Sequence, residues 1–284
     1  MTLKLIALVD GSTYSASVCD HAAWIAGRTG APVELLHVLG RREGGGKPDL
    51  SGAIALGART ALMAELAELD AQRSKLVAQR GRAILEDAQA ILTRAGVAEI
   101  TTRLRHGDIV DTVAEVEHDA SLILIGKRGE AADFAKGHLG SNLERIVRAS
   151  HKPVVVASRA FKPVQKALVA YDGGLSAQKA VDHIAGAPLF AGLSITVATV
   201  GTPSDAVKQG LESAKATLRT AGLAAETRIV EGQPESALGR LVEDEGFDML
   251  VMGAYGHSRI RSLVIGSTTT EMLRSCKVPV VLVR

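Results

Sequence analysis

Aromatic residues and cysteines are scarce in this sequence. Phe, Trp and Tyr make up only 3% of the 284 residues, so a hydrophobic core must be built from Val, Ile, Leu and Ala. The two cysteines, Cys19 and Cys276, lie far apart and have no Cys or His at metal-ligand spacing. We therefore expect both to be small structural residues, and we predict no metal site.

Long hydrophobic runs and blocks of like charge are also missing. No window holds about eighteen consecutive apolar residues, and the short apolar run at the start of the chain is cut by Asp10. These features argue against a membrane span and a secretory signal, so we expect a cytoplasmic protein. The net charge of +2, without a Lys/Arg-rich block, argues against a nucleic-acid partner.

The sequence lacks the motifs of dedicated nucleotide enzymes. It has no G-x-x-x-x-G-K-[ST] loop, and no G-x-G-x-x-G follows the apolar runs at 3–9 and 166–171. Residues 172–176 resemble the loop of ATP pyrophosphatases only faintly, because the leading serine and the later acidic residue are absent. No set of nucleophile, base and orienting acid can be recognised. We therefore assign no catalytic residue. An enzymatic role stays open, although no motif in the sequence supports it.

A glycine-bounded loop near the end of the chain is the most informative stretch. An apolar run precedes Gly253 and Gly256, and nine residues separate Gly256 from Gly266 and Ser267. Glycines let a ligand approach the main chain, and the first amides of a helix opening at Ser267 favour an anion. Three basic residues lie between the glycines: His257, Arg259 and Arg261. The stretch therefore predicts a phosphate-binding loop.

The chain contains an internal duplication. Asp10 and Asp172 each end an apolar run and are 162 residues apart, as are His21 and His183. Later landmarks agree at a shorter offset: Gly107 and Gly232 (125), Gly126 and Gly253 (127), Pro153 and Pro279 (126). We predict two domains of one fold, 1–160 and 161–284, with about 36 extra residues (162 minus 126) in the first.

The extra residues form an insertion over about 40–76. It begins with a glycine-rich loop and continues into a helical pattern from about residue 59 to residue 94. Four leucines recur there at alternating spacings of four and three, with Arg73 in the gap: Leu62, Leu66, Leu69 and Leu76. Two interpretations stay open. The helix packs on its own domain, or it reaches a partner subunit.

Strand and helix patterns alternate throughout, which predicts an α/β fold. The strands expected in the first half are 3–9, 32–38, 99–105, 122–125 and 153–157, and those in the second are 166–171, 194–200, 225–230, 249–252 and 279–283. Such alternation gives parallel sheets with right-handed crossovers. We expect two tandem, doubly wound, parallel five-stranded sheets.

The last strand of each half needs a partner. Residues 154–156 and 280–283 are short, apolar and introduced by proline, so each would be an open edge if unpaired. We predict that the two strands pair with each other. A homodimer would then use another surface, for which the leucine-spaced helix is the candidate.

The loop pattern G-x-x-G-x(9)-G-S on a duplicated α/β unit resembles the universal stress protein family. The resemblance covers essentially the whole chain apart from the insertion. It implies an adenine-nucleotide alpha-hydrolase-like fold, two halves related by a pseudo-twofold axis, and binding of ATP or a related nucleotide (AMP or ADP), with or without Mg²⁺, in stress response or signalling. It assigns a C-terminal site to Asp172, Gly173, Val200, Gly253, Gly256, His257, Arg259, Gly266, Ser267 and Thr268.

The first half carries a changed copy of this site. Its matching residues are Asp10, Gly11, Val38, Gly126, Gly129, Gly140, Ser141 and Asn142. Ten residues rather than nine separate Gly129 from Gly140, and they include Glu130 and Asp133, whose charge would oppose a phosphate. We therefore expect tighter binding in the C-terminal half. Two other functions stay open, namely a slow ATPase or nucleotidyl-transfer enzyme on the same scaffold, and an interaction scaffold that binds no nucleotide.

Overall fold

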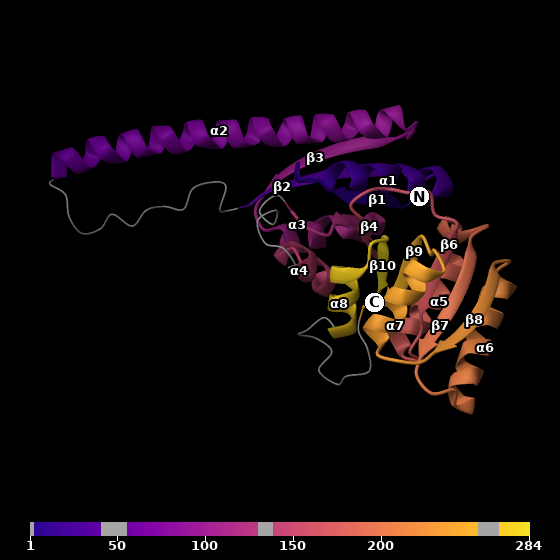
Figure 1. Cartoon of the computed structure of the whole chain (residues 1–284). Helices are drawn as coiled ribbons and strands as arrows, with labels where there is room; N and C mark the ends of the chain where they lie inside the picture. The colour runs from indigo at the N-terminus through magenta and orange to yellow at the C-terminus, as the bar shows by residue number, and fades with distance from the viewer. Residues whose placement is uncertain (1–2, 41–55, 130–138, 255–266) are drawn as a thin grey trace.

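The computed structural model describes residues 3–40, 56–129, 139–254 and 267–284, without the side chains of 56–61 and 267. Within these ranges ten strands form one sheet (Figure 1). The first half supplies β1 (Lys4–Leu8), β2 (Val33–Leu39), β3 (Ile100–His106), β4 (Ala120–Gly126) and β5 (Val154–Ala157). The second half supplies β6 (Lys166–Ala170), β7 (Ser194–Val200), β8 (Ala224–Val230), β9 (Met249–Gly253) and β10 (Val280–Val283).

The strand order is β3-β2-β1-β4-β5-β10-β9-β6-β7-β8. All neighbouring strands are parallel except β5 and β10, which pair antiparallel with Val155 opposite Val281. This confirms the predicted pairing of the two final strands. The two expected five-stranded sheets are therefore joined edge to edge in one sheet.

Helices cover both faces of the sheet. The helices are α1 (Ser15–Thr29), α2 (Leu56–Arg94), α3 (Ile109–Val116), α4 (Ser141–Ala149), α5 (Leu175–Gly186), α6 (Asp205–Thr220), α7 (Pro234–Asp244) and α8 (Ser267–Ser275). One core is packed by side chains of α1, α2, α5 and α6, and the other by side chains of α3, α4, α7 and α8. The chain is thus a three-layer α/β/α structure.

The first strand explains why its sequence is a continuous apolar run. Leu5 and Ala7 belong to one core, and Ile6 and Leu8 belong to the other, because successive side chains of a strand point to opposite faces. A central parallel strand covered on both faces has no solvent-exposed side. For the same reason, β4, β9 and β10 could also be predicted from continuous apolar runs in the sequence.

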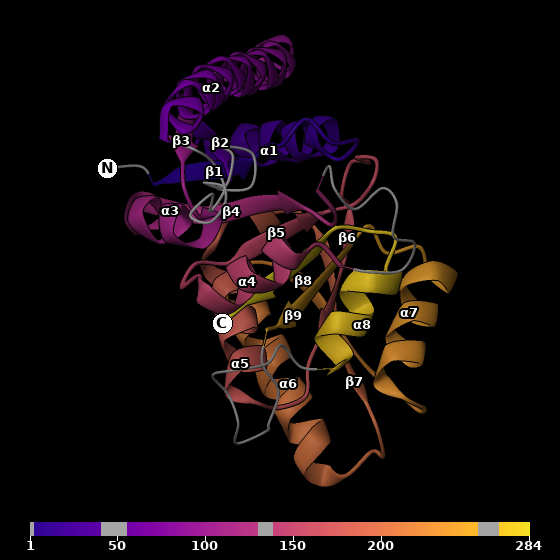
Figure 2. The same ribbon diagram turned by 90° about the vertical axis from the view of Figure 1, so that its left-hand side faces the viewer.

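Helix α2 is the element that breaks the symmetry of the two halves. It spans 39 residues, whereas α6, in the matching place of the second half, spans 16. It ends at Arg94 as predicted and begins at Leu56, three residues before the predicted start. Figure 2 shows α2 lying above α1 at the edge of the molecule.

Candidate functional site

The two predicted sites start from equivalent places in the sheet. In the first half, Asp10 follows β1 and Gly126 ends the neighbouring strand β4. In the second half, Asp172 follows β6 and Gly253 ends the neighbouring strand β9. Each pair of strands lies where the strand order reverses within its half. Open α/β sheets bind ligands at the carboxyl ends of strands at such a switch point.

In the first half, the loop after β4 comes close to Asp10. A Cβ atom added at Gly129 would lie only 2.8 Å from Oδ2 of Asp10. Further along the chain, the amide of Gly140 donates a hydrogen bond to the carbonyl of Lys127 over 3.2 Å. The structure therefore brings together Asp10, Gly129 and Gly140, three residues that are distant in sequence.

Helix α4 opens directly after this glycine. Gly140 is its N-cap residue and provides no side-chain cap, and Ser141 and Asn142 are exposed. The first amides of a helix have no partner within the helix and favour an anion. This helix end can therefore bind a phosphate group through the main chain.

The aspartates at the ends of β1 and β6 hold matching turns. Oδ1 of Asp10 accepts a hydrogen bond from the Ser12 amide at 3.0 Å, and Oδ1 of Asp172 accepts one from the Gly174 amide at 2.8 Å. Gly11 and Gly173 follow the aspartates with φ angles of 77° and 75°, which favour glycine. In both halves the glycine after the aspartate is thus needed for the backbone of the turn.

A buried bond beneath each aspartate was not predicted. Nδ1 of His37 lies 2.7 Å from the carbonyl oxygen of Val9, and the Thr199 hydroxyl donates to the carbonyl of Tyr171 over 2.7 Å. Both polar side chains are buried. Each side chain ties the second strand of its half to the residue before the aspartate. His37 and Thr199 are 162 positions apart, the same offset as the two aspartates, and this offset was the sequence signal that could have revealed their matching roles.

Two of the predicted site glycines are required by packing. A Cβ atom at Gly126 would lie 2.6 Å from Cβ of Tyr14, and one at Gly253 would lie 2.7 Å from Cβ of Ser176. Tyr14 and Ser176 stand at the starts of α1 and α5. These glycines let the loop after β4 or β9 pass the end of a helix.

Val38 and Val200, at the ends of the second strands, are half-buried.

Part of the predicted C-terminal site lies outside the described residues, namely Gly256, His257, Arg259 and Gly266. Ser267 opens helix α8. The hydroxyl of Thr268 donates a hydrogen bond to Oε1 of Glu235 at 2.8 Å. The backbone amide of Glu235 and this hydroxyl hold the pKa of the Glu235 carboxyl below its usual value. Thr268 therefore already has a carboxylate partner beside the predicted site.

A basic cavity of about 200 Å³ lies where the first half meets the end of α8. It is lined by Tyr14, Lys127, Arg128, Leu139, Arg159, Leu273, Arg274, Ser275, Cys276 and Lys277. Arg274 and Lys277 pair with Glu271 at 3.2 Å and Glu243 at 2.9 Å. The cavity adjoins the loop that holds Gly129, and both halves contribute to it. Sequence reasoning missed it because the two walls are distant in the chain.

Lys127 is the buried member of this cavity, with 8% of its surface exposed. Its Nζ donates a hydrogen bond to the carbonyl of Cys276. Burial lowers the pKa of Lys127, the neighbouring Cys276 raises it, and Arg128 lowers it further. Lys127 thus links the loop after β4 in the first half to the end of α8 in the second.

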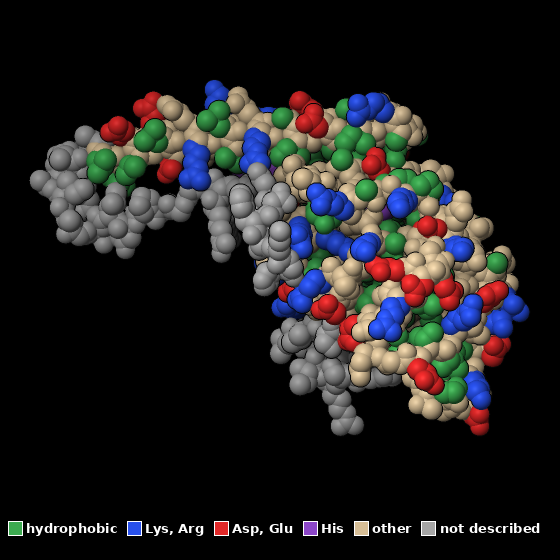
Figure 3. All heavy atoms as spheres, viewed as in Figure 1, with side chains coloured by type: hydrophobic (Ala, Val, Ile, Leu, Met, Phe, Trp, Pro, Cys, Tyr) green, Lys and Arg blue, Asp and Glu red, His purple; other side chains and the backbone are tan. Residues whose placement is uncertain are grey.

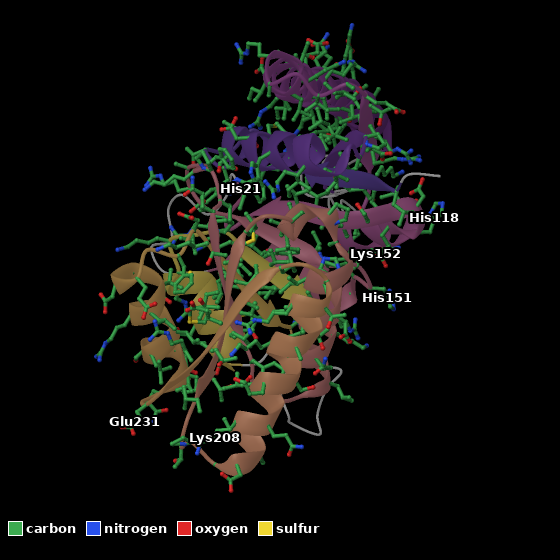
Figure 4. All side chains as sticks on the ribbon, turned by 90° about the vertical axis from the view of Figure 1, so that its right-hand side faces the viewer. His21, His118, His151, Lys152, Lys208 and Glu231 are labelled. Atoms are coloured by element: carbon green, nitrogen blue, oxygen red, sulfur yellow. The ribbon has the colours of Figure 1, made fainter. Side chains whose placement is uncertain are left out.

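A cluster of Ser150, His151 and Glu117 lies at the opposite end of the sheet. The Ser150 hydroxyl donates to Oε2 of Glu117 at 2.6 Å, and Nδ1 of His151 lies 3.0 Å from Oε1 of the same carboxylate. Figure 4 shows His151 beside His118 and Lys152, at the molecular edge. Because Ser150 and His151 both bond the carboxylate, the histidine does not activate the serine as a triad requires.

No group of three or more His, Cys, Asp or Glu side chains within the described residues could hold a metal ion. Among the helices in those ranges, none has the length and hydrophobicity to cross a bilayer.

Comparisons with known proteins were made with the sequence and with the fold. The model of the universal stress protein family matches twice, over residues 1–158 and 163–284. Universal stress protein Slr1230 of Synechocystis sp. is 37% identical over 285 aligned residues, covering 99% of each chain. Universal stress protein MJ0577 of Methanocaldococcus jannaschii is 28% identical over 81 residues, covering 28% of this chain and 50% of its own.

A solved structure agrees at the level of the fold. The crystal structure of a universal stress protein from Archaeoglobus fulgidus superposes with a TM-score of 0.74 and 20% identity, covering 99% of this chain and 98% of its own. The double match to the family model agrees with the internal duplication and with the two halves of the sheet. The chain therefore belongs to the universal stress protein family, as a tandem member with two copies of the family domain.

Proposed function

We propose that the protein binds ATP or a related adenine nucleotide (AMP or ADP) in the cytoplasm and acts in stress response or signalling. The ligand would bind at the carboxyl ends of the strands, with Mg²⁺ as a counter-ion of its phosphates. Each half would offer one site, and the C-terminal site would be the tighter of the two.

The observation that carries the proposal is the close approach of Asp10 to the loop at Gly129. An ionised carboxylate accepts hydrogen bonds, which suits the hydroxyl groups of a ribose. The first amides of α4, just beyond Gly140, lack partners within the helix and can donate hydrogen bonds, which suits a phosphate. A nucleotide carries both kinds of group, because its ribose has hydroxyl groups and its phosphates have acceptor oxygens.

The neighbouring residues support the same ligand. Half-buried Val38 and Val200 offer an apolar contact for a base at the ends of the second strands. The cationic lining of the basic cavity, with Lys127, Arg128 and Arg159 on the side of the first half, would attract an anion toward the N-terminal site.

The difference between the two sites follows from their loops. The C-terminal loop has the nine-residue spacing and carries His257 and Arg259, whereas the N-terminal loop is one residue longer and carries Glu130 and Asp133. Negative side chains near a phosphate oppose its binding. We therefore assign the tighter site to Asp172, Gly253 and the loop that follows.

Calorimetric titration with Mg-ATP tests both sites. The variant Gly256→Asp should abolish the heat of the tighter site, because it adds a carboxylate beside the phosphates. The variant Gly129→Ala should weaken the second site by about tenfold or more, because the new Cβ displaces the Asp10 carboxylate. Gly27→Ala is the matched control, since a Cβ there has no atom within 4 Å.

The outcomes separate the assignments. If Gly256→Asp binds as the wild type does, the C-terminal assignment is wrong. If Gly129→Ala binds as Gly27→Ala does, the N-terminal half has no nucleotide site. Wild-type protein that gives no heat with ATP, ADP or AMP favours the interaction scaffold instead.

A further inference from the structure

Much of helix α2 lies beyond the body of its own domain. At 1.5 Å per residue its 39 residues extend about 58 Å, against about 24 Å for the 16 residues of α6. Figure 1 shows the N-terminal part of α2 projecting past the sheet, and Figure 3 shows hydrophobic side chains along that part. An isolated helix is only marginally stable in water, so packing against a partner would stabilise the projecting part of α2.

Only the C-terminal part of α2 packs on the sheet. Gly81, Leu85, Ala88 and Leu92 are buried at spacings of four, three and four, and no described side chain in residues 62–80 is buried. The three residues that repeat every seven positions are exposed: Leu62 by 36%, Leu69 by 54% and Leu76 by 65%. The described part of the domain therefore packs against one end of α2 and does not cover its leucine-rich end.

The exposed leucines lie on a different face from the packed residues. At about 100° per residue, Leu76 is turned by about 180° from Leu85, and Leu69 by about 160°. A straight helix cannot turn both faces toward one sheet. The leucines are therefore directed away from their own domain, so the interpretation that the whole helix packs on its domain is wrong for this part.

The spacing is that of a short coiled coil. Leu62, Leu69 and Leu76 take the d positions of consecutive heptads, and Leu66, Arg73 and Arg80 take the a positions. Leucine repeated at d forms the apolar seam along which coiled-coil helices pack. The arginines at a can lay their apolar stems along the seam and keep their charge at its edge.

The charges select the orientation. Within residues 62–80 the acidic residues come first and the basic ones follow: Glu65, Glu68 and Asp70, then Arg73, Lys75 and Arg80. A parallel pair would align like charges with each other. An antiparallel pair would lay the acidic part of each helix beside the basic part of the other, so the segment is complementary to a second copy of itself.

We propose that residues 62–80 of α2 form an antiparallel two-stranded coiled coil with the same residues of a second copy of this chain. Matching a to d positions places Leu66 opposite Leu76 of the second copy, and Leu69 opposite Arg73. Arg80 then lies opposite Leu62, less than one helical turn along the axis from Glu65. The dimer leaves the β5–β10 pairing intact, because that pairing is satisfied within one chain. It is reversible and salt-sensitive, because arginines occupy two of the six seam positions.

Sedimentation equilibrium of the full chain tests the association. Wild type should be a dimer at about 0.1 mM in low salt and dissociate in high salt. The double variant Leu69→Glu/Leu76→Glu should be a monomer with an unchanged melting temperature, because both side chains are exposed. Leu175→Glu is the matched control, since Leu175 on α5 is 72% exposed, and it should remain dimeric.

Cysteine cross-linking tests the orientation. In the antiparallel alignment residue 65 lies beside residue 79 of the second copy, so mixed Glu65→Cys and Gln79→Cys chains should form a disulfide-linked heterodimer. Each variant alone should not cross-link, because its own positions would be about 21 Å apart along the helix. A monomeric wild type, a dimeric double variant, or cross-linking of each variant to itself would overturn the proposal.

Discussion

At the scale of single residues, much of each site is built from contacts that hold the backbone. His37 and Thr199 fix the strand beside each aspartate, and the aspartates fix the turns that follow. A ligand bound as proposed would therefore meet carboxylates and amides whose positions are already set, which would lower the ordering cost of binding. Lys127 likewise fixes the backbone where the two halves meet, because its Nζ donates a hydrogen bond to the carbonyl of Cys276.

The cysteines illustrate how burial decides reactivity. Burial, with a further contribution from Asp20, raises the pKa of Cys19 to about 12. At pH 8, well below that pKa, Cys19 is held as the thiol, whereas the thiolate is the reactive form. Burial also raises the pKa of Cys276.

We predict that native protein incubated with iodoacetamide at pH 8 is not alkylated at Cys19 or Cys276, whereas unfolded protein is alkylated at both. Peptide mass spectrometry after quenching measures the two sites separately. Fast alkylation of Cys19 in the native protein would show that α1 opens readily.

At the scale of elements, helix α3 shows how one residue sets a helix start. Asp108 caps this helix, because its Oδ1 accepts hydrogen bonds from the amides of Val110 and Asp111 at 2.8 and 3.4 Å. Its Oδ2 accepts a hydrogen bond from Arg145 of α4 at 2.7 Å. Arg145 first, and then the two amides, hold the pKa of Asp108 below its usual value against the opposing effect of burial.

We predict that Asp108→Ala lowers the free energy of unfolding by about 0.5–2 kcal/mol at pH 7, because the cap is lost. Asp108→Asn keeps an N-cap oxygen and should cost less. The lowered pKa means that the ionised cap stabilises above the unfolded value of about 3.9, and this stabilisation is lost as pH falls through the folded pKa. Urea unfolding of both variants at pH 7 and pH 3 measures these differences, and an Asp108→Ala cost that persists unchanged at pH 3 would contradict the assignment.

Most elements of the fold could be predicted from the sequence, because buried parallel strands appear as continuous apolar runs. Strand β7 was predicted at 194–200 and is Ser194–Val200. Contacts between distant segments could not be predicted. The bond from Lys127 to Cys276 spans 149 positions, and the approach of Gly129 to Asp10 depends on the path of a loop. Packing alone explains the glycines at 126 and 253, so composition does not separate a ligand loop from a tight turn.

At the scale of the whole molecule, strand β10 joins the two halves. It lies between β5 and β9, so its main-chain groups are used on both sides. Side chains add further bonds between the halves: Arg28 donates to the carbonyl of Leu189, and Arg284 donates to the carbonyl of Arg148, both over 2.7 Å. The two halves should therefore unfold as one unit.

We predict that Val281→Pro destabilises both halves together, because it removes a ladder amide at the centre of the sheet. The lost bond alone costs about 1–3 kcal/mol. Val281→Ala, which keeps the amide, should cost less and is the control. Thermal denaturation followed by circular dichroism measures the change, and a Val281→Pro variant that melts at the wild-type temperature would show that the strand pairing contributes little.

The central claim is that this tandem protein binds adenine nucleotides at the carboxyl ends of its strands. Equilibrium dialysis of the wild-type chain against radiolabelled ATP tests it most directly, because it counts bound nucleotide without depending on heat or activity. We predict saturable binding, with one ATP per chain filled at low concentration and a second at higher concentration. Bound nucleotide that stays at background up to about 1 mM ATP, a limit of about −4.1 kcal/mol, would contradict the claim.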